Sequence, residues 1–146
     1  MKLSREIKYG LLIFLGISSL FLLLKILGLE KLNYLRFLNG VVVYYFIYRV
    51  QQLNAKEGKF NFVENFISIV KTALIGVFLS VIGLTIYVTY NGGQAFLNTI
   101  SSGFLFGKNP SVNEYCFGLL IEGLSSVAAL SFICIQSWKS QTTTQG

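Results

Sequence analysis

One acidic side chain, Glu122, stands inside an apolar run of the sequence, CFGLLIEGLSSVAAL at 116–130. An ionised group in the hydrocarbon of a bilayer costs on the order of 2.5–3.5 kcal/mol on insertion scales. Such a carboxyl group is therefore protonated, paired with a cation, or used to couple a proton or cation to transport. Glu122 is the candidate functional residue of the chain, and the structural alternative is one half of a buried pair.

The residue types that most enzymes need are missing. The sequence has no His, and its acidic residues are all Glu. It therefore lacks the commonest general base and the usual zinc and haem ligands. No Gly-rich phosphate loop opens a helix, and Cys116 and Cys134 form no CxxC pair. On one helix the two cysteines would lie about 27 Å apart, too far for a disulfide. We expect no catalytic activity, no cofactor and no metal.

The composition is that of a membrane protein. The chain has 146 residues, of which 53% are hydrophobic and only 12% are charged, whereas soluble domains carry about 25% charged residues. The net charge of +6 comes from Lys and Arg residues that mostly flank apolar runs. Basic residues in that position contact lipid headgroups and set topology, so we expect a lipid bilayer as partner and no nucleic acid.

Four segments are apolar enough to cross a bilayer, which takes about 20 residues of helix. They cover about residues 7–27, 32–48, 66–90 and 115–138. The second segment is the weakest because Arg36 lies within it. The sequence predicts an all-α membrane domain over residues 1–138, a bundle of four transmembrane helices, followed by a polar tail at 139–146.

The distribution of basic residues indicates the orientation. If both termini are cytoplasmic, eight basic residues lie inside and four outside: Lys2, Arg5, Lys8, Arg49, Lys56, Lys59, Lys71 and Lys139 against Lys25, Lys31, Arg36 and Lys108. An excess of Lys and Arg marks the cytoplasmic side. We therefore expect an N-in, C-in protein, and we assign it to a bacterial cytoplasmic membrane.

Two sequence patterns predict helix starts. Asn61 with Glu64, and Ser111 with Glu114, have the spacing of a capping box, in which the cap oxygen and the acid bond to free backbone N–H groups. These two acids therefore have a structural explanation that Glu122 lacks.

The connections between the predicted spans differ in character. Residues 49–59 read as a polar cytoplasmic loop. Residues 91–111 read as a half-apolar outer loop, in which Phe96, Ile100 and Phe104 recur every four residues. That spacing predicts a short interfacial helix between the third and fourth spans.

Small residues indicate which helix faces pack together, because they let backbones approach closely inside a bilayer. In the third span the packing stripe contains Gly76, Ser80 and Gly83. In the fourth span the predicted packing face holds Glu122 and four small residues, and the opposite, lipid-facing side holds larger ones. The small residues are Gly118, Ser125, Ser126 and Ala129, and the larger ones are Phe117, Leu120, Leu124 and Val127.

Arg36 is the leading candidate partner of Glu122. It lies about 18 Å above Tyr48, and Glu122 about 24 Å above Trp138, so both fall in the outer part of the membrane. Lys25 is the second candidate. A protonated Glu122 bonded to Ser125 or Ser126 of a neighbouring copy is the remaining structural alternative.

The stretch at 48–87 resembles a known but uncharacterised family, a domain of unknown function. Members are four-span inner-membrane proteins common in Bacteroidota. The resemblance rests on a polar, basic loop followed by Gly58, Phe60, Asn61, Phe62 and Phe66. Asn61 replaces the more usual Ser or Thr of that family, and Glu114 matches an acid near the start of its fourth helix. The resemblance implies the four-span layout and brings no activity.

The sequence predicts a non-catalytic integral membrane protein. We expect an accessory or scaffolding subunit of a membrane complex, with a protein partner or self-association in the membrane. The alternative is a small proton- or ion-coupled carrier that uses the intramembrane carboxylate of Glu122.

Overall fold

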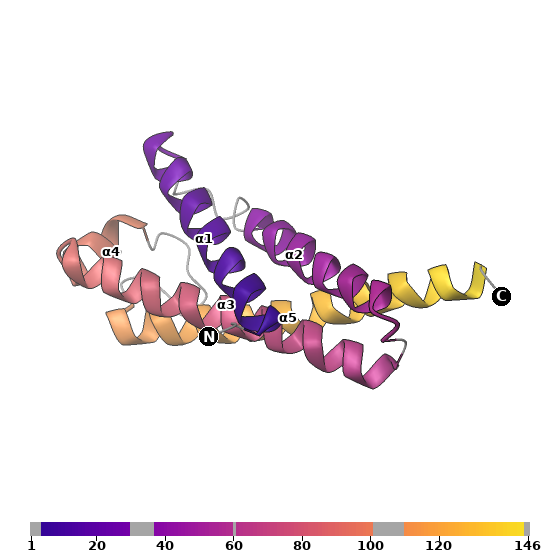
Figure 1. The fold of residues 1–146 in the computed structure, drawn as a ribbon. Coiled ribbons are helices and arrows are strands. Elements are labelled where there is room, and N and C mark those ends of the chain that lie inside the picture. Colours follow the sequence, from indigo (N-terminus) through magenta and orange to yellow (C-terminus); the bar gives the residue numbers. More distant parts are fainter. Residues whose placement is uncertain (1–3, 30–36, 60, 101–109, 145–146) are drawn as a thin grey trace.

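The computed structural model describes residues 4–29, 37–59, 61–100 and 110–144, and this part of the chain is helical with no strand. The helices are α1 (Arg5–Ile26), α2 (Phe37–Lys56), α3 (Phe62–Tyr90), α4 (Gln94–Ile100) and α5 (Val112–Thr144). Figure 1 shows α3 and α5 lying side by side, with α1 and α2 inclined across them. The prediction of a short helix within residues 91–111 is confirmed by α4.

Side-chain caps begin three of these helices. Ser4 caps α1, and Asn61 caps α3 by accepting a hydrogen bond from the Val63 N–H at 3.1 Å. The Ser111 N–H donates to a Glu114 carboxylate oxygen at 2.8 Å, and the Glu114 N–H donates to the Ser111 hydroxyl at 3.2 Å. This reciprocal pair confirms the capping box predicted for the last helix.

The helices alternate in direction along the bundle. Glu6 meets Ser68 near the starts of α1 and α3, and Phe21 packs on Tyr87 near their ends, so α1 and α3 are parallel. The close approach of Gly16 to Val42 and the hydrogen bond from Arg5 to Asn54 show that α2 runs antiparallel to α1.

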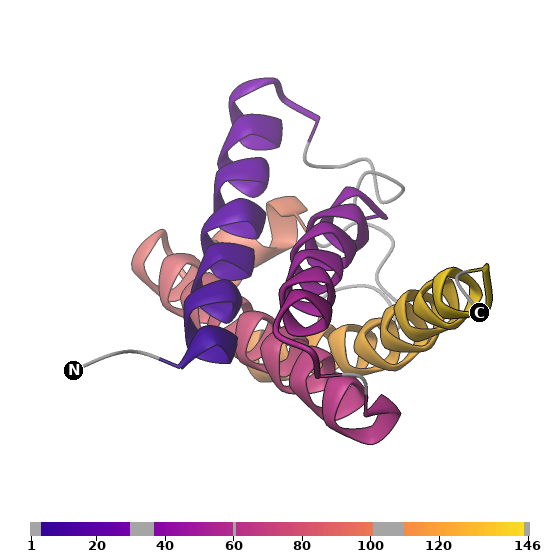
Figure 2. The same ribbon diagram turned by 45° about the vertical axis from the view of Figure 1, so that its right-hand side comes forward.

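Contacts of α5 complete the arrangement. Cys116 lies 2.9 Å from the Thr85 hydroxyl, and Phe132 packs on Phe66, so α5 is antiparallel to α3. One end of the molecule therefore holds the start of α1, the end of α2, the start of α3 and residues 132–134 of α5. Figure 2 shows from a second side how the helices cross one another.

Glycines allow the closest helix crossing. A Cβ atom at Gly76 of α3 would lie 2.5 Å from a methyl group of Ile13, and one at Gly10 of α1 would lie 2.6 Å from Ile75. Gly83 likewise contacts Phe14. The predicted packing role of Gly76 and Gly83 is confirmed, and their partner is α1.

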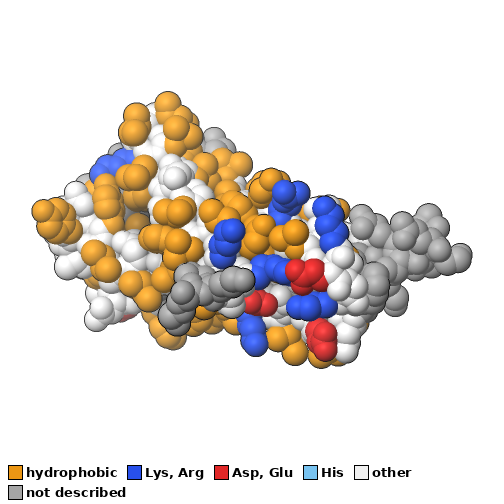
Figure 3. Space-filling view, viewed as in Figure 1, with side chains coloured by type: hydrophobic (Ala, Val, Ile, Leu, Met, Phe, Trp, Pro, Cys, Tyr) orange, Lys and Arg blue, Asp and Glu red, His pale blue; other side chains and the backbone are white. Residues whose placement is uncertain are grey.

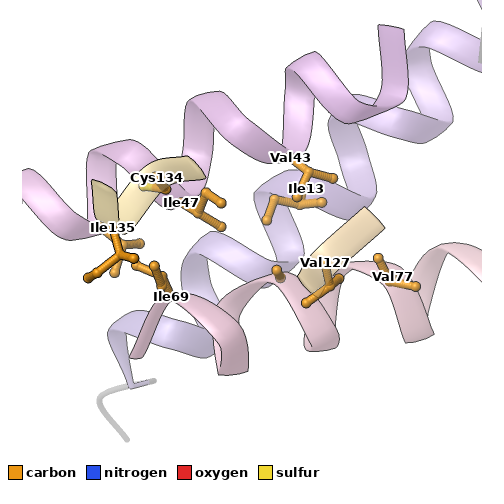
Figure 4. Close-up of a cluster of buried hydrophobic side chains, with 10 residues drawn as sticks. Ile13, Val43, Ile47, Ile69, Val77, Val127, Cys134 and Ile135 are labelled. Carbon is orange, nitrogen blue, oxygen red and sulfur yellow. The ribbon is translucent and has the colours of Figure 1, made fainter. Parts of the chain in front are cut away.

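The core lies where α1, α2, α3 and α5 meet. Its buried side chains are aliphatic or thiol groups that Figure 4 shows pointing toward one another. They are Ile13, Val43, Ile47, Val50, Ile69, Ala73, Val77, Val127, Cys134 and Ile135.

The predicted packing face of the last helix is only partly correct. Gly118 is buried and Glu122 is half-buried, but Ser125, Ser126 and Ala129 are exposed. Val127, assigned to the lipid side, is instead 3% exposed.

The reason is that the neighbours of α5 change along its length. In the first half of α5 Gly123 contacts Val77 of α3, whereas in its second half Cys134 bonds to Gln51 of α2. The buried face therefore turns around the helix, while the prediction assumed one straight stripe.

The boundaries of α2 differ most from the prediction. Residues 49–56, expected to be a polar loop, continue the helix, and Val50, Gln51 and Asn54 are buried in it. Polar side chains there have partners inside the bundle, which hydropathy alone does not reveal. Near the C-terminus, α5 runs through Thr144, so residues 139–144 of the expected polar tail are helical.

Among the described residues three helices are long and apolar enough to cross a membrane, namely α1, α3 and Val112–Ser137 of α5, so the predicted fourth span is not confirmed. Figure 3 shows hydrophobic side chains over much of the molecule and a gathering of Lys, Arg and Glu toward one end. Exposed charged residues of that end are Lys8, Arg49, Lys56, Glu57, Lys59, Glu64 and Lys71. The described chain is thus a helical membrane protein with a polar end.

Candidate functional site

A cavity of about 320 Å³ opens between α1, α2, α3 and α5, and Glu122 lines it. Its volume is at the small end of the range of known ligand pockets, which is roughly 300–1,000 Å³. Most of the wall is apolar, as in typical small-molecule sites. The polar groups of the wall are Ser18, Asn39, Ser80, Tyr87, Tyr115, Glu122 and Ser126.

Three of the four helices place a glycine at the wall of the cavity. Gly40 of α2, Gly83 of α3 and Gly123 of α5 all border the cavity and carry no side chain that could fill it. Gly123 also lets α5 approach Val77 of α3, which fixes the segment that carries Glu122.

The rim of the cavity is apolar on the side of α1. Leu22 is 47% exposed and Leu29 is 37% exposed, and both line the cavity. In a membrane Leu22, which lies within α1, would face acyl chains rather than water. The cavity is therefore suited to a molecule that arrives from the bilayer.

Glu122 supplies the chemical character of the cavity. It is half-buried and is the only acidic or basic side chain among the described residues that line the wall. A carboxylate accepts hydrogen bonds from hydroxyl or ammonium groups, and a protonated carboxyl group can also donate one. The arrangement can bind a hydrogen-bonding head group beside an apolar body, or take up and release a proton.

Of the two predicted partners of Glu122, the structure describes Lys25. Arg36 lies outside the described residues, so the predicted Arg36–Glu122 pair stays a prediction. Lys25 instead donates a hydrogen bond to the Tyr87 hydroxyl, with its ammonium nitrogen 4.9 Å from the ring centres of Tyr87 and Phe96. Lys25 therefore joins the last turn of α1 to the end of α3 and the first turn of α4.

The two serines next to Glu122 are used within their own helix. The Ser125 hydroxyl donates to the Ile121 carbonyl and the Ser126 hydroxyl to the Glu122 carbonyl, both at 2.9 Å. Ser126 also lines the cavity. Of the other predicted stripe residues, Ser80 and Gly83 line it as well.

Sequence reasoning missed two polar residues of the wall, Ser18 and Asn39. Each lies on a different helix from Glu122 and is an unremarkable residue in its own segment. Ser18 and Asn39 reach the cavity of Glu122 only because α1 and α2 pack near α5. The spacing of residues along a single helix does not predict such packing.

A second polar region lies at the opposite end of the bundle. Arg5 donates to the Asn54 amide oxygen at 2.6 Å and forms an ion pair with Glu57. The hydrogen bond from Arg5 lowers the pKa of Glu57 below its ordinary value, with smaller effects from the charges of Arg5 and Lys59. This contact ties the start of α1 to the end of α2.

Both cysteines are free thiols. Cys134 is buried and its thiol donates to the Gln51 amide oxygen at 2.7 Å. Among the described residues no group of three or more His, Cys, Asp or Glu side chains could hold a metal ion.

No protein-family model, no curated protein and no solved structure matches the chain. The resemblance of residues 48–87 to a four-span family therefore stays a prediction. What can be said of function rests on the cavity and its surroundings.

Proposed function

We propose that this chain is a non-catalytic membrane protein that binds a small amphiphilic molecule from the bilayer in the cavity beside Glu122. The single observation that carries the proposal is the cavity itself. It combines a mostly apolar wall, an exposed leucine rim and one carboxyl group in a space of about 320 Å³. A ligand complementary to it has a short apolar body and a head that donates hydrogen bonds, such as an amine or an alcohol.

The proposal includes four membrane crossings, with α2 as the fourth. α2 begins near the end of α1 and returns the chain to the level at which α1 started, since Asn54 meets Arg5. Because α1 and α3 are parallel, the chain must pass back across the bundle between them. The parallel direction of α1 and α3 supports a crossing by α2, although its apolar part is short.

We also propose that Arg36 and Glu122 form the predicted pair at this site. Arg36 directly precedes α2 in the sequence, and Asn39 and Gly40 of the first turn of α2 line the same cavity as Glu122. A buried carboxylate is much less costly when a guanidinium group is its partner. If the protein is a carrier, a ligand or a proton would bind Glu122 in exchange for Arg36.

Photo-labelling with matched probes tests the binding proposal. The protein in lipid nanodiscs is exposed to decylamine, decanol and decanoic acid, each carrying the same diazirine, and the labelled peptides are mapped by mass spectrometry. We expect the amine and the alcohol to label peptides that line the cavity and the acid to label them several-fold less, because the first two head groups can donate a hydrogen bond to Glu122 in place of Arg36 and a carboxylate cannot.

The chain offers a matched control on neighbouring positions. Ser18 lines the cavity, whereas the adjacent Ser19 is exposed on the outside of α1. Ser18→Phe should abolish labelling of the cavity peptides and Ser19→Phe should leave it unchanged. Equal labelling in both variants, or labelling spread evenly over the lipid-facing surface, would contradict the proposal.

The carrier form of the proposal has its own test. In liposomes, proton-dependent uptake of the labelled amine that disappears in Glu122→Gln would support coupled transport. Binding without uptake would identify a binding protein and would rule out a carrier of that amine.

An accessory subunit is the second candidate function, and one observation favours it. Ser125, Ala128 and Ala129 form a group of small, exposed residues on α5 that this chain leaves uncovered. Small residues in a membrane are typical of helix–helix interfaces, so a protein partner or a second copy would fit there. Cross-linking at an introduced Ala129→Cys in the native membrane, which we propose to be a bacterial cytoplasmic membrane, would capture that neighbour; a lack of any adduct would count against this role.

A further inference from the structure

A groove distinct from the cavity lies between the first turn of α1 and the middle of α3. Its lining residues are Ser4, Glu6, Lys71, Leu74 and Ile75. The groove lies beside the close approach of α1 and α3 at Gly10 and Gly76. It is thus a place where the bundle leaves a space open to its surroundings.

The groove lies at the level of the lipid headgroups. α1 is long and apolar enough to cross a membrane, and Ser4 and Glu6 stand at its start. The Ser68 hydroxyl donates to Glu6 at 3.1 Å, which brings the adjacent turn of α3, with Lys71, to the same level. Leu74 and Ile75 lie one turn further toward the apolar part of α3.

The charges of the groove have opposite signs. Glu6 lies in the first turn of α1, where the helix dipole and the Ser68 hydroxyl favour its ionised form. Lys71 is exposed, and its ammonium group can reach a ligand in the groove. A complementary ligand therefore carries both an anion and a cation on an apolar tail.

We propose that this groove binds a phospholipid with a primary ammonium headgroup, namely phosphatidylethanolamine. Lys71 binds the phosphodiester, Glu6 accepts hydrogen bonds from the ethanolamine ammonium, and one acyl chain lies along Leu74 and Ile75. A choline headgroup has no N–H to donate to Glu6, and a glycerol headgroup has no positive charge. The groove is independent of the Glu122 cavity, so this assignment stands apart from the proposed function.

Native mass spectrometry with defined lipids tests the assignment. The detergent-solubilised full chain is titrated with phosphatidylethanolamine, phosphatidylcholine and phosphatidylglycerol of identical acyl chains. We expect phosphatidylethanolamine to bind about three- to fivefold more tightly than the other two, as one partly exposed ion pair would give. If phosphatidylglycerol binds best, the basic end attracts anionic lipid in general and the proposal is wrong.

Variants separate the two ends of the headgroup. Glu6→Gln keeps an acceptor for Ser68 and should reduce phosphatidylethanolamine binding to the level of phosphatidylcholine. Lys71→Gln should weaken the binding of both phosphatidylethanolamine and phosphatidylcholine, and Lys71→Arg should restore it.

The control variants change exposed charges outside the groove, Glu64→Gln and Lys56→Gln, and should preserve the lipid preference. An unchanged preference in Glu6→Gln, or its equal loss in Glu64→Gln, would overturn the assignment. If Glu6→Gln fails to fold, the comparison of Lys71→Gln with Lys71→Arg at an exposed position still decides whether the phosphate is bound there.

Discussion

Glu122 is a carboxyl group that the chain keeps half-buried beside the glycine of α5 that packs on α3. At the scale of single residues, the question is which group stabilises it. Coupling energies between residues in direct contact are about 0.5–3 kcal/mol, which a double-mutant cycle can measure.

The pair proposed for this site predicts non-additive losses. Glu122→Gln and Arg36→Gln should each lower the free energy of unfolding in detergent, and the double variant should lose no more than the more damaging single change. Lys25→Gln combined with Glu122→Gln serves as the control and should be additive, because Lys25 bonds to Tyr87. Additive losses for Arg36 and Glu122 would show that the two side chains act independently.

The contact between Arg5 and Glu57 predicts a pH dependence. Because the pKa of Glu57 is lowered in the folded chain, mainly by the hydrogen bond from Arg5, its ionised form stabilises the fold above the ordinary value of 4.5. This stabilisation is lost as the pH falls through the lowered pKa. Thermal unfolding at a series of pH values should show a smaller acid-induced decrease in Glu57→Gln than in the original chain, and Glu64→Gln, which leaves the Arg5–Glu57 ion pair intact, should behave like the original chain.

At the scale of helices, the crossing of α1 and α3 depends on the absence of side chains at Gly10 and Gly76. Gly76→Ala would place a methyl group 2.5 Å from Ile13, and overpacking of this kind costs about 1–3 kcal/mol. At Gly40 a methyl group meets nothing closer than 3.8 Å, so Gly40→Ala should be neutral or stabilising, by up to about 1 kcal/mol. Unfolding measured in the same detergent should rank the two variants in that order; equal stability would contradict the close crossing.

Helix positions were predictable from the sequence where apolar content and caps agree. The run of α3 to Tyr90, the start of α5 after Ser111 and the presence of α4 follow from hydropathy, cap spacing and a four-residue repeat. The extension of α2 through Lys56 was not predictable in this way. Its buried polar residues, Gln51 and Asn54, find partners on α5 and α1, and a sequence shows no such partner until the helices are packed.

The candidate site was predictable in part: Glu122 and the predicted stripe residues Ser80, Gly83 and Ser126 line the cavity. Glu122 is conspicuous because a carboxyl group in an apolar run needs a reason. Much of the cavity wall comes from three other helices, and the turn of the buried face along α5 places Ser125 and Ala129 on the outside. When neighbouring helices cross at an angle, a buried face that is predicted from a single residue is correct for only a few turns of the helix.

At the scale of the whole molecule, the alternating helices and the polar end form one consistent arrangement. Exposed charged residues gather where α1 starts, α2 ends and α3 starts, and the exposed leucine rim of the cavity lies toward the other end of α1. This arrangement supports the proposed N-in orientation, because positive charge concentrates on the cytoplasmic side. It requires α2 to cross the membrane.

Side-specific labelling of single cysteines tests that requirement most directly. In a chain with Cys116 and Cys134 replaced by Ala, a cysteine is introduced at Ser4, Leu29, Lys59 or Asn91, and a membrane-impermeant maleimide is applied to sealed cells and to opened membranes. We expect cysteines at positions 4 and 59 to react only after the membranes are opened, whereas cysteines at positions 29 and 91 should react in sealed cells. Labelling of Lys59 on the same side as Leu29 would show that α2 does not cross, and would contradict the four-crossing bundle.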